Sequence, residues 1–392
     1  MLRVESFSRA HLFYYFVSIA NGNGIGIDEP GSWLEASKRV LGVDGEVSHS
    51  QLADLVEGIN PDTFSCLDQR AAKRKIGHFD LVFAAPKSVS ILALCAGDEI
   101  YSKVLDAHES SVEKALNWAG RHAVSVAGPI PGDEHNVSST GILGAQFIHR
   151  TSRKNDPHLH SHIVMPNLAQ GVDGHWGSAR TRQLFLNSRY VGEIYQCHLR
   201  EKMTKDLGVN WTRFRNGVAD LQGIGPEVIR NFSKRSQEIT RLLNHPLSAQ
   251  NDLKFAALNS RPEKDLTKTV ESLRPMWQDQ LAKLGVPHET LLKNTLEKEQ
   301  NRPANHLLAL LGEIPSDKEQ AKNWHNLAKA IDEYREKWGL QNSVLPLGPS
   351  CLELAKETSN SVSRLSDLMK IEHDISARQW LRINEIEHFR GF

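Results

Sequence analysis

Alternation of apolar and polar residues predicts several β-strands in the first part of the chain. Residues 79–85 place apolar side chains on one face and Asp80 on the other, as a half-buried strand does. Residues 143–149 and 159–165 have the composition of two further strands. A turn at residues 173–174 indicates that another strand follows it.

Helical spacing predicts that helices are mixed with these strands. Apolar residues recur at intervals of three and four from about residue 100 to residue 122, and residues 190–207 form a second expected helix. His108 lies on the apolar face of the first helix, so we expect a hydrogen-bonded core residue there. Strands and helices in this order indicate a sheet that helices cover on one face.

Residues 291–392 have a different character. Four prolines punctuate them, and Ser316 with Glu319 forms a capping box before an expected helix. A second helical pattern follows at 363–389. We therefore expect two units: a domain that carries the chemistry over residues 1–290, and a helical accessory or partner-binding region after it.

Composition narrows the class of protein. Among 392 residues, 47 basic side chains balance 47 acidic ones, which argues against coating nucleic acid by bulk attraction but allows a local basic groove. The four cysteines are far apart and form no C-x-x-C pair, which favours a reducing, cytoplasmic setting. There is no run of 18 apolar residues and no signal-peptide pattern, so we expect no membrane insertion.

The most informative segment contains four histidines within residues 149–162. Alternate residues of a strand share a face, so His160 and His162 project together. A tight return at residues 156–157 would bring His149 beside them. Three converging imidazoles make a metal site with open positions that can polarise a substrate oxygen. An isolated His-x-His, by contrast, is more often a chance pair on a wet strand.

The fourth histidine and the donor set leave the ion open. His158 extends the row and is expected at its rim or against substrate, although it could be a fourth ligand. Magnesium prefers oxygen ligands, so manganese, zinc or nickel would be natural on ligand softness alone. We expect one divalent ion, with magnesium, manganese and zinc all possible identities.

Tyr14 and Tyr15 are candidate nucleophiles. Tyrosine can attack phosphorus and stay covalently attached. With a pKa of about 10 it is a weak nucleophile until a cation or base favours the phenolate. An aromatic pair in so apolar a segment is, taken alone, more often part of a core.

Asp80 interrupts an otherwise apolar strand. A buried carboxylate is costly unless it is paired, so it would need a partner such as a histidine N–H or a tyrosine hydroxyl. It could then orient a metal-bound histidine or accept the tyrosine proton. The alternative is a strand-end aspartate that is half in solvent.

Together these features resemble the MobF-type conjugative relaxases, whose nicking domain belongs to the HUH endonucleases. The Pro-Lys-Ser exit from the Asp80 strand, combined with the three histidines, is highly specific. The matching segments follow the family's order across about residues 1–290. They are Tyr14-Tyr15 and residues 42–47, 80–90, 107–108, 149–162 and 232–239.

The resemblance implies an α+β relaxase palm of two layers, with a mainly antiparallel sheet of about five strands covered by helices. It implies that Tyr14 is the first nucleophile and that Asp80 assists it and orients a histidine. By the same match, His149, His160 and His162 hold one divalent cation. The implied reaction is strand-specific nicking and rejoining at a conjugative transfer origin, through a 5′-phosphotyrosyl intermediate. The substrate would be a DNA hairpin with an adjoining single strand.

DNA binding by a chain with no net charge has to draw on local basic residues. Phosphate contacts position DNA, although basic clusters are usually only solvated faces. The main candidates are Arg74, Lys87, Arg150, Arg153, Lys234 and Arg235, with Arg70, Lys73 and Lys75 beside the first of them.

Two departures from the family pattern limit these expectations. Many members have a second tyrosine pair downstream of the first, whereas residues 21–26 contain no tyrosine, so Tyr15 is the remaining candidate for a second nucleophile. Large members continue into an ATP-driven helicase, but this sequence contains no G-x-x-x-x-G-K-[ST] loop. Unwinding is therefore expected from a separate helicase. An accessory DNA-binding protein and a type IV secretion coupling protein are further expected partners, and the protein could enter a recipient cell attached to DNA.

Three other interpretations fit parts of the sequence. A rolling-circle replication initiator usually has its histidines before its tyrosine, the reverse of the order here. A catalytically idle relaxase-like protein would bind DNA or a secretion apparatus, yet the nucleophile and histidines are present. A metallohydrolase of small phosphate esters would form no tyrosyl adduct.

Overall fold

The structure is a computed structural model. It describes residues 2–8, 12, 30–127, 136–212, 218–242 and 268–296. Tyr14, Tyr15 and nearly all of the predicted helical region lie outside the described residues.

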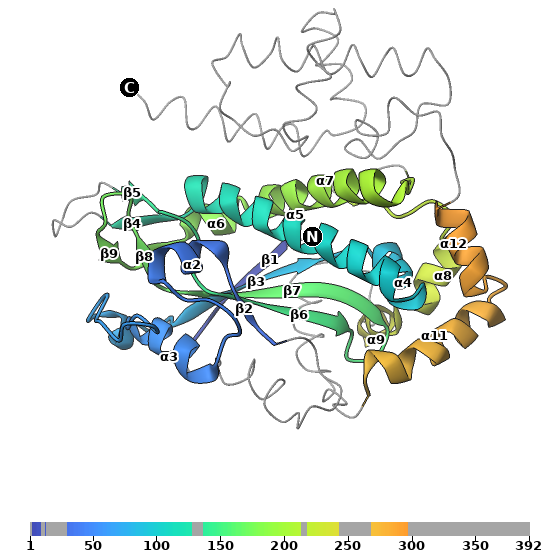
Figure 1. The fold of residues 1–392 in the computed structure, drawn as a ribbon, viewed down its shortest axis with the longest axis horizontal. Coiled ribbons are helices and arrows are strands. Elements are labelled where there is room, and N and C mark those ends of the chain that lie inside the picture. Colours follow the sequence, from blue (N-terminus) through green and yellow to red (C-terminus); the bar gives the residue numbers. More distant parts are fainter. Residues whose placement is uncertain are drawn as a thin grey trace, which may run out of the picture.

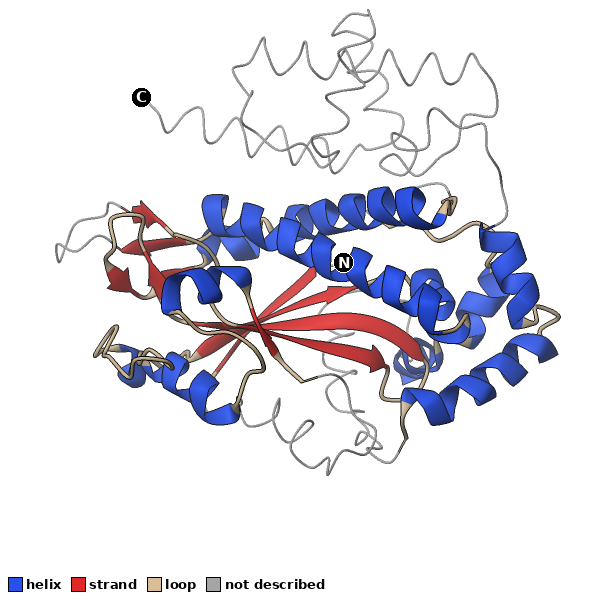
Figure 2. Ribbon diagram, in the orientation of Figure 1, coloured by secondary structure: helices blue, strands red, loops and turns tan. Residues whose placement is uncertain are grey.

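A five-stranded antiparallel sheet forms the centre of the described fold (Figures 1 and 2). The three strands expected from alternation are confirmed as β3, β6 and β7, and the fold is α+β as expected. In spatial order the strands are β1 (Leu2–Phe7), β3 (His78–Ala84), β7 (Pro157–Pro166), β6 (Ala145–Thr151) and β2 (Ser32–Trp33).

Helices cover one face of this sheet. α5 (Asp98–His122) and α7 (Ser188–Leu207) pack side by side across it, and α4 (Lys87–Cys95) follows β3 almost directly (Figure 1). Both helices expected from the sequence are thereby confirmed. Leu81 and Ile163 point from the sheet into the core beneath these helices, and neither is accessible to solvent.

His108 joins the helix layer to the sheet. Its Nδ1 lies 2.7 Å from the hydroxyl of Tyr195 on α7, and its Nε2 lies 2.7 Å from the hydroxyl of Ser161 on β7. Burial lowers the pKa of His108 to about 3, so the ring is neutral at pH 7. The prediction of a hydrogen-bonded core residue is confirmed.

The opposite face of the sheet carries a second apolar cluster. Helices α2 (Glu35–Leu41) and α3 (His49–Glu57) contribute to it. The sheet contributes Phe147 and Val164, and the N-terminal part of the chain contributes Leu12.

Shorter elements complete the described fold. The strand expected after the turn at 173–174 is confirmed as β9, in a two-stranded sheet of β8 (Ala169–Gln170) and β9 (Trp176–Gly177). A three-stranded sheet contains β10 (Ala179–Arg180), β4 (Ser125–Ala127) and β5 (Asn136–Ser138). The remaining described helices are η2 (Ala71–Lys73), α6 (Arg182–Leu186), α8 (Pro226–Asn231), α9 (Lys234–Leu242), α11 (Val270–Lys283) and α12 (His288–Leu296).

The last described helix crosses the expected boundary at residue 290. Leu291 of α12 is fully buried in the main core cluster, so the packed unit extends at least that far. The division of the chain into 1–290 and 291–392 stays a prediction. In the part of the chain that the structure describes, no helix is long and apolar enough to span a bilayer.

Candidate metal and phosphate site

Three histidines from the two central strands converge on one face of the sheet. The register of β6 and β7 places His149 directly opposite His160, and His162 lies two residues further along β7. The ring centroids are 5.2 Å apart for His149 and His160, 4.9 Å for His149 and His162, and 5.3 Å for His160 and His162. One nitrogen of each ring lies within 4.8 Å of the others. This donor set fits one divalent ion with open positions for a substrate oxygen.

A tight turn between β6 and β7 produces this alignment. The N–H of Ser152 donates to the carbonyl oxygen of Asp156 at 2.9 Å, and the N–H of Asn155 donates to that of Ser152 at 2.9 Å. Asn155 has a left-handed φ of 55°, which asparagine tolerates better than most residues. The sequence placed the return at Asp156-Pro157. It ends instead at Asp156, because Pro157 already pairs with Thr151 as the first residue of β7.

Hydrogen bonds orient the rings of His162 and His160. Both carboxylate oxygens of Asp80 lie 2.9 Å from Nδ1 of His162, and the Asp80 side chain is buried rather than half in solvent. Nδ1 of His160 lies 2.9 Å from the backbone oxygen of His158. When Nδ1–H donates in each case, Nε2 is the nitrogen that would bind a metal. Partners of this kind set the tautomer and raise ligand basicity in metal sites.

His158 continues the row without joining the group of three. Its ring stacks on that of His160, with centroids 4.5 Å apart and planes 27° apart. Burial lowers the pKa of His158 well below its usual value, and the neighbouring His160 lowers it further. The expected position of His158 at the rim or against substrate stays a prediction.

A buried carboxylate connects the histidine hairpin to two predicted phosphate contacts. Asp156 is 1% exposed. It accepts a hydrogen bond from the backbone N–H of Lys234 at 2.8 Å, and its Oδ1 lies 3.3 Å from Nζ of that lysine. Burial raises the pKa of Asp156, while the charges of Lys234 and Lys87 oppose the rise.

Lys87 lies close enough to this carboxylate for their charges to interact. Its Nζ donates to the backbone oxygen of Pro157 at 2.7 Å, one residue before His158. Burial lowers the pKa of Lys87 to about 8, and the charge of Asp156 opposes the drop. The protein therefore keeps an ammonium next to the histidine hairpin although its burial is unfavourable.

Sequence reasoning missed the role of Asp156. The sequence indicates Asp156 only as part of a turn, because its partner Lys234 comes 78 residues later. The available signal was an acidic residue immediately before the histidine row in an otherwise basic segment.

Two other predicted phosphate contacts are engaged within the protein. Arg74 forms an ion pair with Asp68 and donates to the backbone oxygen of Asn167. Arg235 donates to a carboxylate oxygen of Glu238 at 2.7 Å. Contact of either guanidinium with DNA would require exchange of these partners.

Arg150 and Arg153 follow the histidine strand in different ways. Because side chains alternate along β6, Arg150 points away from His149, and its guanidinium lies 5.9 Å from the ring centre of Tyr101 on α5. The structure thus places Arg150 on the helix side of the sheet. Arg153 belongs to the turn that joins β6 to β7.

The predicted nucleophiles lie outside the described residues, but one neighbour is described. Leu12 is 4% exposed and packs in the cluster that contains Phe147 and Val164. Phe147 lies two residues before His149 on β6, and Val164 lies two residues after His162 on β7. Both therefore lie on the same face of the sheet as the histidines. The chain two residues before Tyr14 therefore lies on the histidine side.

The fold and the three-histidine cluster define an α+β relaxase palm. The chain belongs to the TrwC relaxase family, whose sequence pattern matches residues 13–284.

Curated relatives have the same character. The multifunctional conjugation protein TraI of Escherichia coli is 30% identical over 244 residues, and TraI of Escherichia coli strain K12 is 29% identical over 244 residues. Each match covers 59% of this chain but only 13% of the relative. The chain thus corresponds to a small part of these relatives.

Solved structures of conjugative relaxase TrwC share the fold. Its metal-bound complex with OriT DNA is 28% identical, with a TM-score of 0.65 over 74% of this chain and all of that one. A complex of TrwC with a 27-mer DNA comprising the recognition hairpin and the cleavage site has a TM-score of 0.63 at 28% identity, with the same coverage.

Proposed function

We propose that this protein nicks and rejoins one DNA strand at a conjugative transfer origin. Membership of the TrwC relaxase family supports this reaction, as do the TrwC structures that contain OriT DNA. The observation that carries the proposal is the convergence of His149, His160 and His162, with Asp80 behind His162, on the sheet face that also holds Leu12.

The histidine cluster is the proposed binding site of the scissile phosphate. A divalent ion held by the three rings would contribute positive charge and Lewis acidity at a non-bridging phosphate oxygen. The chain supplies the rest of the arrangement. Asp80 and the backbone of His158 orient the rings, and His158 at the rim is placed to contact the DNA.

Tyr14 is the proposed nucleophile. It follows Leu12 by two residues, which can span at most about 7 Å of extended chain, and Leu12 packs beside the histidine strands. The phenolic oxygen attacks phosphorus, the bond from phosphorus to the 3′ oxygen breaks, and the leaving oxygen takes up a proton. The products are a 5′-phosphotyrosine and a free 3′-hydroxyl. Asp80 is the candidate acceptor for the phenolic proton.

The reverse reaction reseals the strand. One phosphodiester replaces another, so the step is nearly thermoneutral and requires no ATP. Tyr15 is the proposed second nucleophile if a second strand transfer occurs.

Basic residues around the hairpin are proposed to hold the DNA. Lys87 and Lys234 have the strongest support, because both lie against Asp156 at the end of the histidine strands. Arg153 in the adjoining turn is a further contact. Contacts by Arg74, Arg150 and Arg235 are also proposed, although each of these side chains has a partner within the protein.

The biological setting follows from the proposed reaction. The substrate would be a hairpin with an adjoining single strand, and a separate helicase would unwind the duplex. An accessory DNA-binding protein and a type IV secretion coupling protein are proposed as further partners. Activity would take place in a bacterial cytoplasm, from which the protein would pass to a recipient cell attached to DNA.

The test is a covalent adduct. Labelled single-stranded DNA carrying the cognate origin is incubated with the protein and manganese, and denaturing electrophoresis then resolves any DNA–protein band. Tyr14→Phe should reduce the adduct by at least about 1000-fold, because it removes the attacking oxygen, while DNA affinity changes little.

Tyr15→Phe is the matched control and should retain the first nick. A full adduct with Tyr14→Phe that disappears with Tyr15→Phe would reassign the nucleophile. DNA binding without any adduct would favour a catalytically idle protein.

A further inference from the structure

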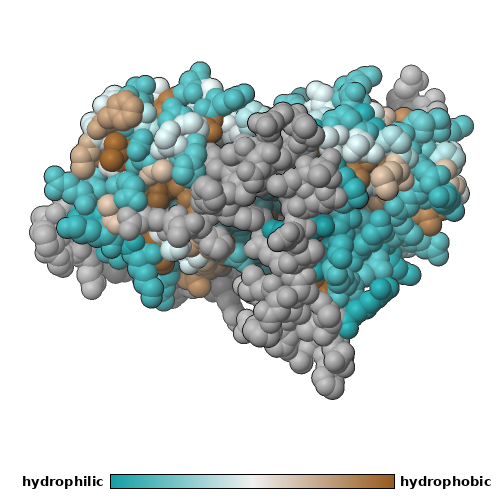
Figure 3. Space-filling model, turned by 90° about the horizontal axis from the view of Figure 1, so that it is seen from below, coloured by the Kyte–Doolittle hydropathy of each residue, from teal (hydrophilic) through white to brown (hydrophobic). Residues whose placement is uncertain are grey.

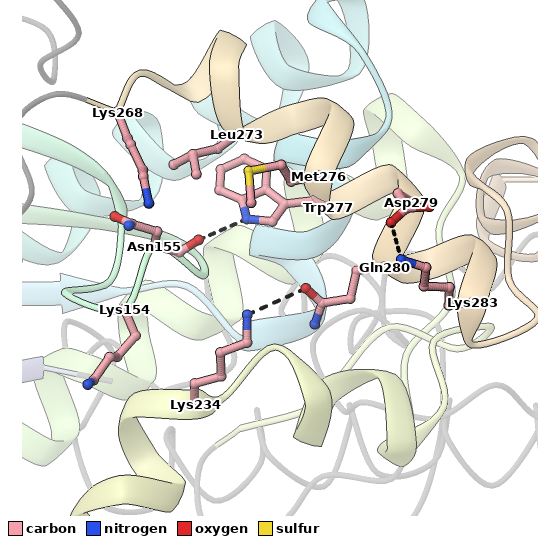
Figure 4. A pocket seen from close by; sticks show the side chains of 10 residues that line it. All are labelled: Lys154, Asn155, Lys234, Lys268, Leu273, Met276, Trp277, Asp279, Gln280 and Lys283. Carbon is pink, nitrogen blue, oxygen red and sulfur yellow. Dashed lines mark hydrogen bonds and ion pairs between the residues drawn. The ribbon is translucent and has the colours of Figure 1, made fainter.

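A basic pocket lies beside the turn that joins the two histidine strands (Figure 4). Its volume is about 380 Å³, which falls within the usual range for small-ligand pockets. The pocket is lined by residues of the turn, by the first residue of α9, by residues of α11 and by Lys268, which lies two residues before α11. Those that carry the argument are Lys154, Lys234, Lys268, Met276, Trp277 and Lys283.

The charge of this pocket departs from that of the whole chain. The chain has no net charge, yet four of the ten lining residues are lysines and one, Asp279, is acidic. Seen from below in Figure 3, the half of the described surface that includes α11 is mainly hydrophilic. A local concentration of ammonium groups on a neutral protein suits a polyanion such as a nucleic-acid backbone.

The lysines have acidic neighbours that a phosphate can replace. Lys154 lies 2.9 Å from Glu238, and Lys283 lies 2.6 Å from Asp279. The lysine side chains of these pairs are 37% and 74% exposed, so each pair contributes little free energy. Exchanging either partner for a phosphate oxygen therefore costs little.

The floor of the pocket is apolar and fixed. Nε1 of Trp277 donates to the backbone oxygen of Asn155 at 2.8 Å, which ties α11 to the turn. Trp277 is 2% exposed, whereas the neighbouring Met276 is 58% exposed. In Figure 4, Met276 and Trp277 lie beside Lys268 and on the opposite side of the pocket from Lys234. An exposed, polarizable thioether next to a rigid indole offers an apolar surface on which a flat base can pack.

The pocket is one turn away from the histidine cluster. Lys154 and Asn155 lie between His149 and His158 along the chain. Lys234 belongs both to the pocket and to the ion pair with Asp156. The pocket therefore borders the end of the hairpin that carries the histidines, and Lys234 belongs to both surroundings.

We propose that the pocket holds one nucleotide of single-stranded DNA next to the scissile phosphate. Lysines contact its phosphate, and its base packs on the exposed side chain of Met276. This inference rests on the proposed function and names a segment of its substrate.

The phosphate contact is tested on the full chain with fluorescein-labelled oligothymidylate, by anisotropy over a range of salt concentrations. Lys268→Gln/Lys283→Gln should reduce the slope of log Kd against log salt by about 0.7 for each phosphate that the variant no longer neutralises. The matched control is Lys103→Gln/Lys114→Gln, which removes the same charge from exposed positions on α5. A pocket variant with the slope and affinity of the control would overturn the proposal.

The base contact is tested with an oligonucleotide of abasic sites. Met276→Ala should weaken binding of oligothymidylate by about fivefold and leave binding of the abasic strand unchanged. Val172→Ala, at another exposed apolar position, should change neither. Equal losses on both strands would overturn the assignment of a base to this floor.

The position next to the cleavage site is tested with origin DNA shortened one nucleotide at a time. The wild type should lose nicking rate when the pocket nucleotide is removed, and Lys268→Gln/Lys283→Gln should be insensitive to that removal. Equal sensitivity of the two proteins at every length would overturn the placement. A chain that shows the pocket-dependent salt slope but forms no adduct would instead contradict the proposed function, so the two failures are distinguishable.

Discussion

The two faces of the central sheet use histidine in opposite ways. On the helix face, His108 has hydrogen-bond partners at both ring nitrogens, in Tyr195 and Ser161. On the other face, Asp80 holds Nδ1 of His162 and a backbone oxygen holds Nδ1 of His160. The first arrangement uses the whole ring as a structural link. The second holds each ring by Nδ1 and directs the other nitrogen to a shared point.

The difference follows from a shift of one residue. Ser161, the partner of His108, lies between His160 and His162 on β7. Side chains alternate along a strand, so Ser161 points into the core and the two histidines point to the site. A register slip of one residue would exchange these environments. The identity of a residue therefore says less about its role than the face on which it lies.

The largest effects should come from exchanging the two kinds of histidine for alanine. His160→Ala should weaken manganese binding at least about 100-fold and reduce nicking correspondingly, with little change in thermal stability, because the ring lies at a site rather than in the core. His108→Ala should leave metal affinity nearly unchanged but lower the free energy of unfolding by about 3 kcal/mol, because it leaves a cavity and two unpaired hydroxyls.

Isothermal titration with manganese and urea denaturation measure the two quantities. The comparison would be wrong if His108→Ala lowered metal affinity without lowering the free energy of unfolding. It would also be wrong if His160→Ala strongly lowered the free energy of unfolding but kept the metal affinity of the wild type.

Asp80→Asn should have a smaller effect on the same face. The amide is isosteric but can present an NH₂ group to Nδ1 of His162, which favours the wrong tautomer. Metal affinity should fall by about 10-fold to 100-fold, with stability changed by less than His108→Ala changes it. Asp68→Asn is a suitable comparison, since Asp68 pairs with Arg74 away from the histidines and should not alter metal binding. Equal metal affinities for Asp80→Asn and the wild type would show that this carboxylate does not orient a ligand.

Much of the sheet and of the histidine cluster could be predicted because both depend on local alternation. Period-two spacing places His160 and His162 together, and a hairpin requires only a few residues to bring His149 opposite them. Asp80 followed from the cost of a buried charge, which requires a partner. Each of these arguments uses residues on the same strand or on strands whose pairing the pattern indicates.

The rest depends on packing between segments that are distant in sequence. The ion pair of Asp156 with Lys234 spans 78 residues, and the bond of Trp277 to Asn155 spans 122. No periodicity in the sequence brings α9 and α11 to the turn of the histidine hairpin. Arg150 shows a different source of error. Its position next to His149 in sequence suggests a contact with DNA at the site, but alternation along β6 places its side chain on the face covered by helices, against Tyr101.

The smallest effect should come from Lys87, the buried cation beside the histidine face. Its pKa of about 8 in the folded protein lies below its ordinary value of 10.5. The penalty for burying the ammonium is therefore complete below pH 8. It is relieved as the pH rises from 8 to 10.5, where the unfolded chain binds the proton and the folded chain does not, so stability rises with pH.

Lys87→Met should remove this rise with pH. It should also increase the free energy of unfolding at pH 7 by about 1 kcal/mol, which is the relieved burial penalty minus the contribution of the lost hydrogen bond to Pro157. It should also weaken binding of single-stranded DNA. Urea denaturation at several pH values from 7 to 10 measures the first effect. Lys103→Met, at an exposed position of α5, is the control for removal of a lysine charge. Parallel curves for Lys87→Met and the wild type would show that the cation has no burial cost. A gain in stability at the expense of DNA binding would place Lys87 with His160 and His162, among residues retained for the site rather than for the fold.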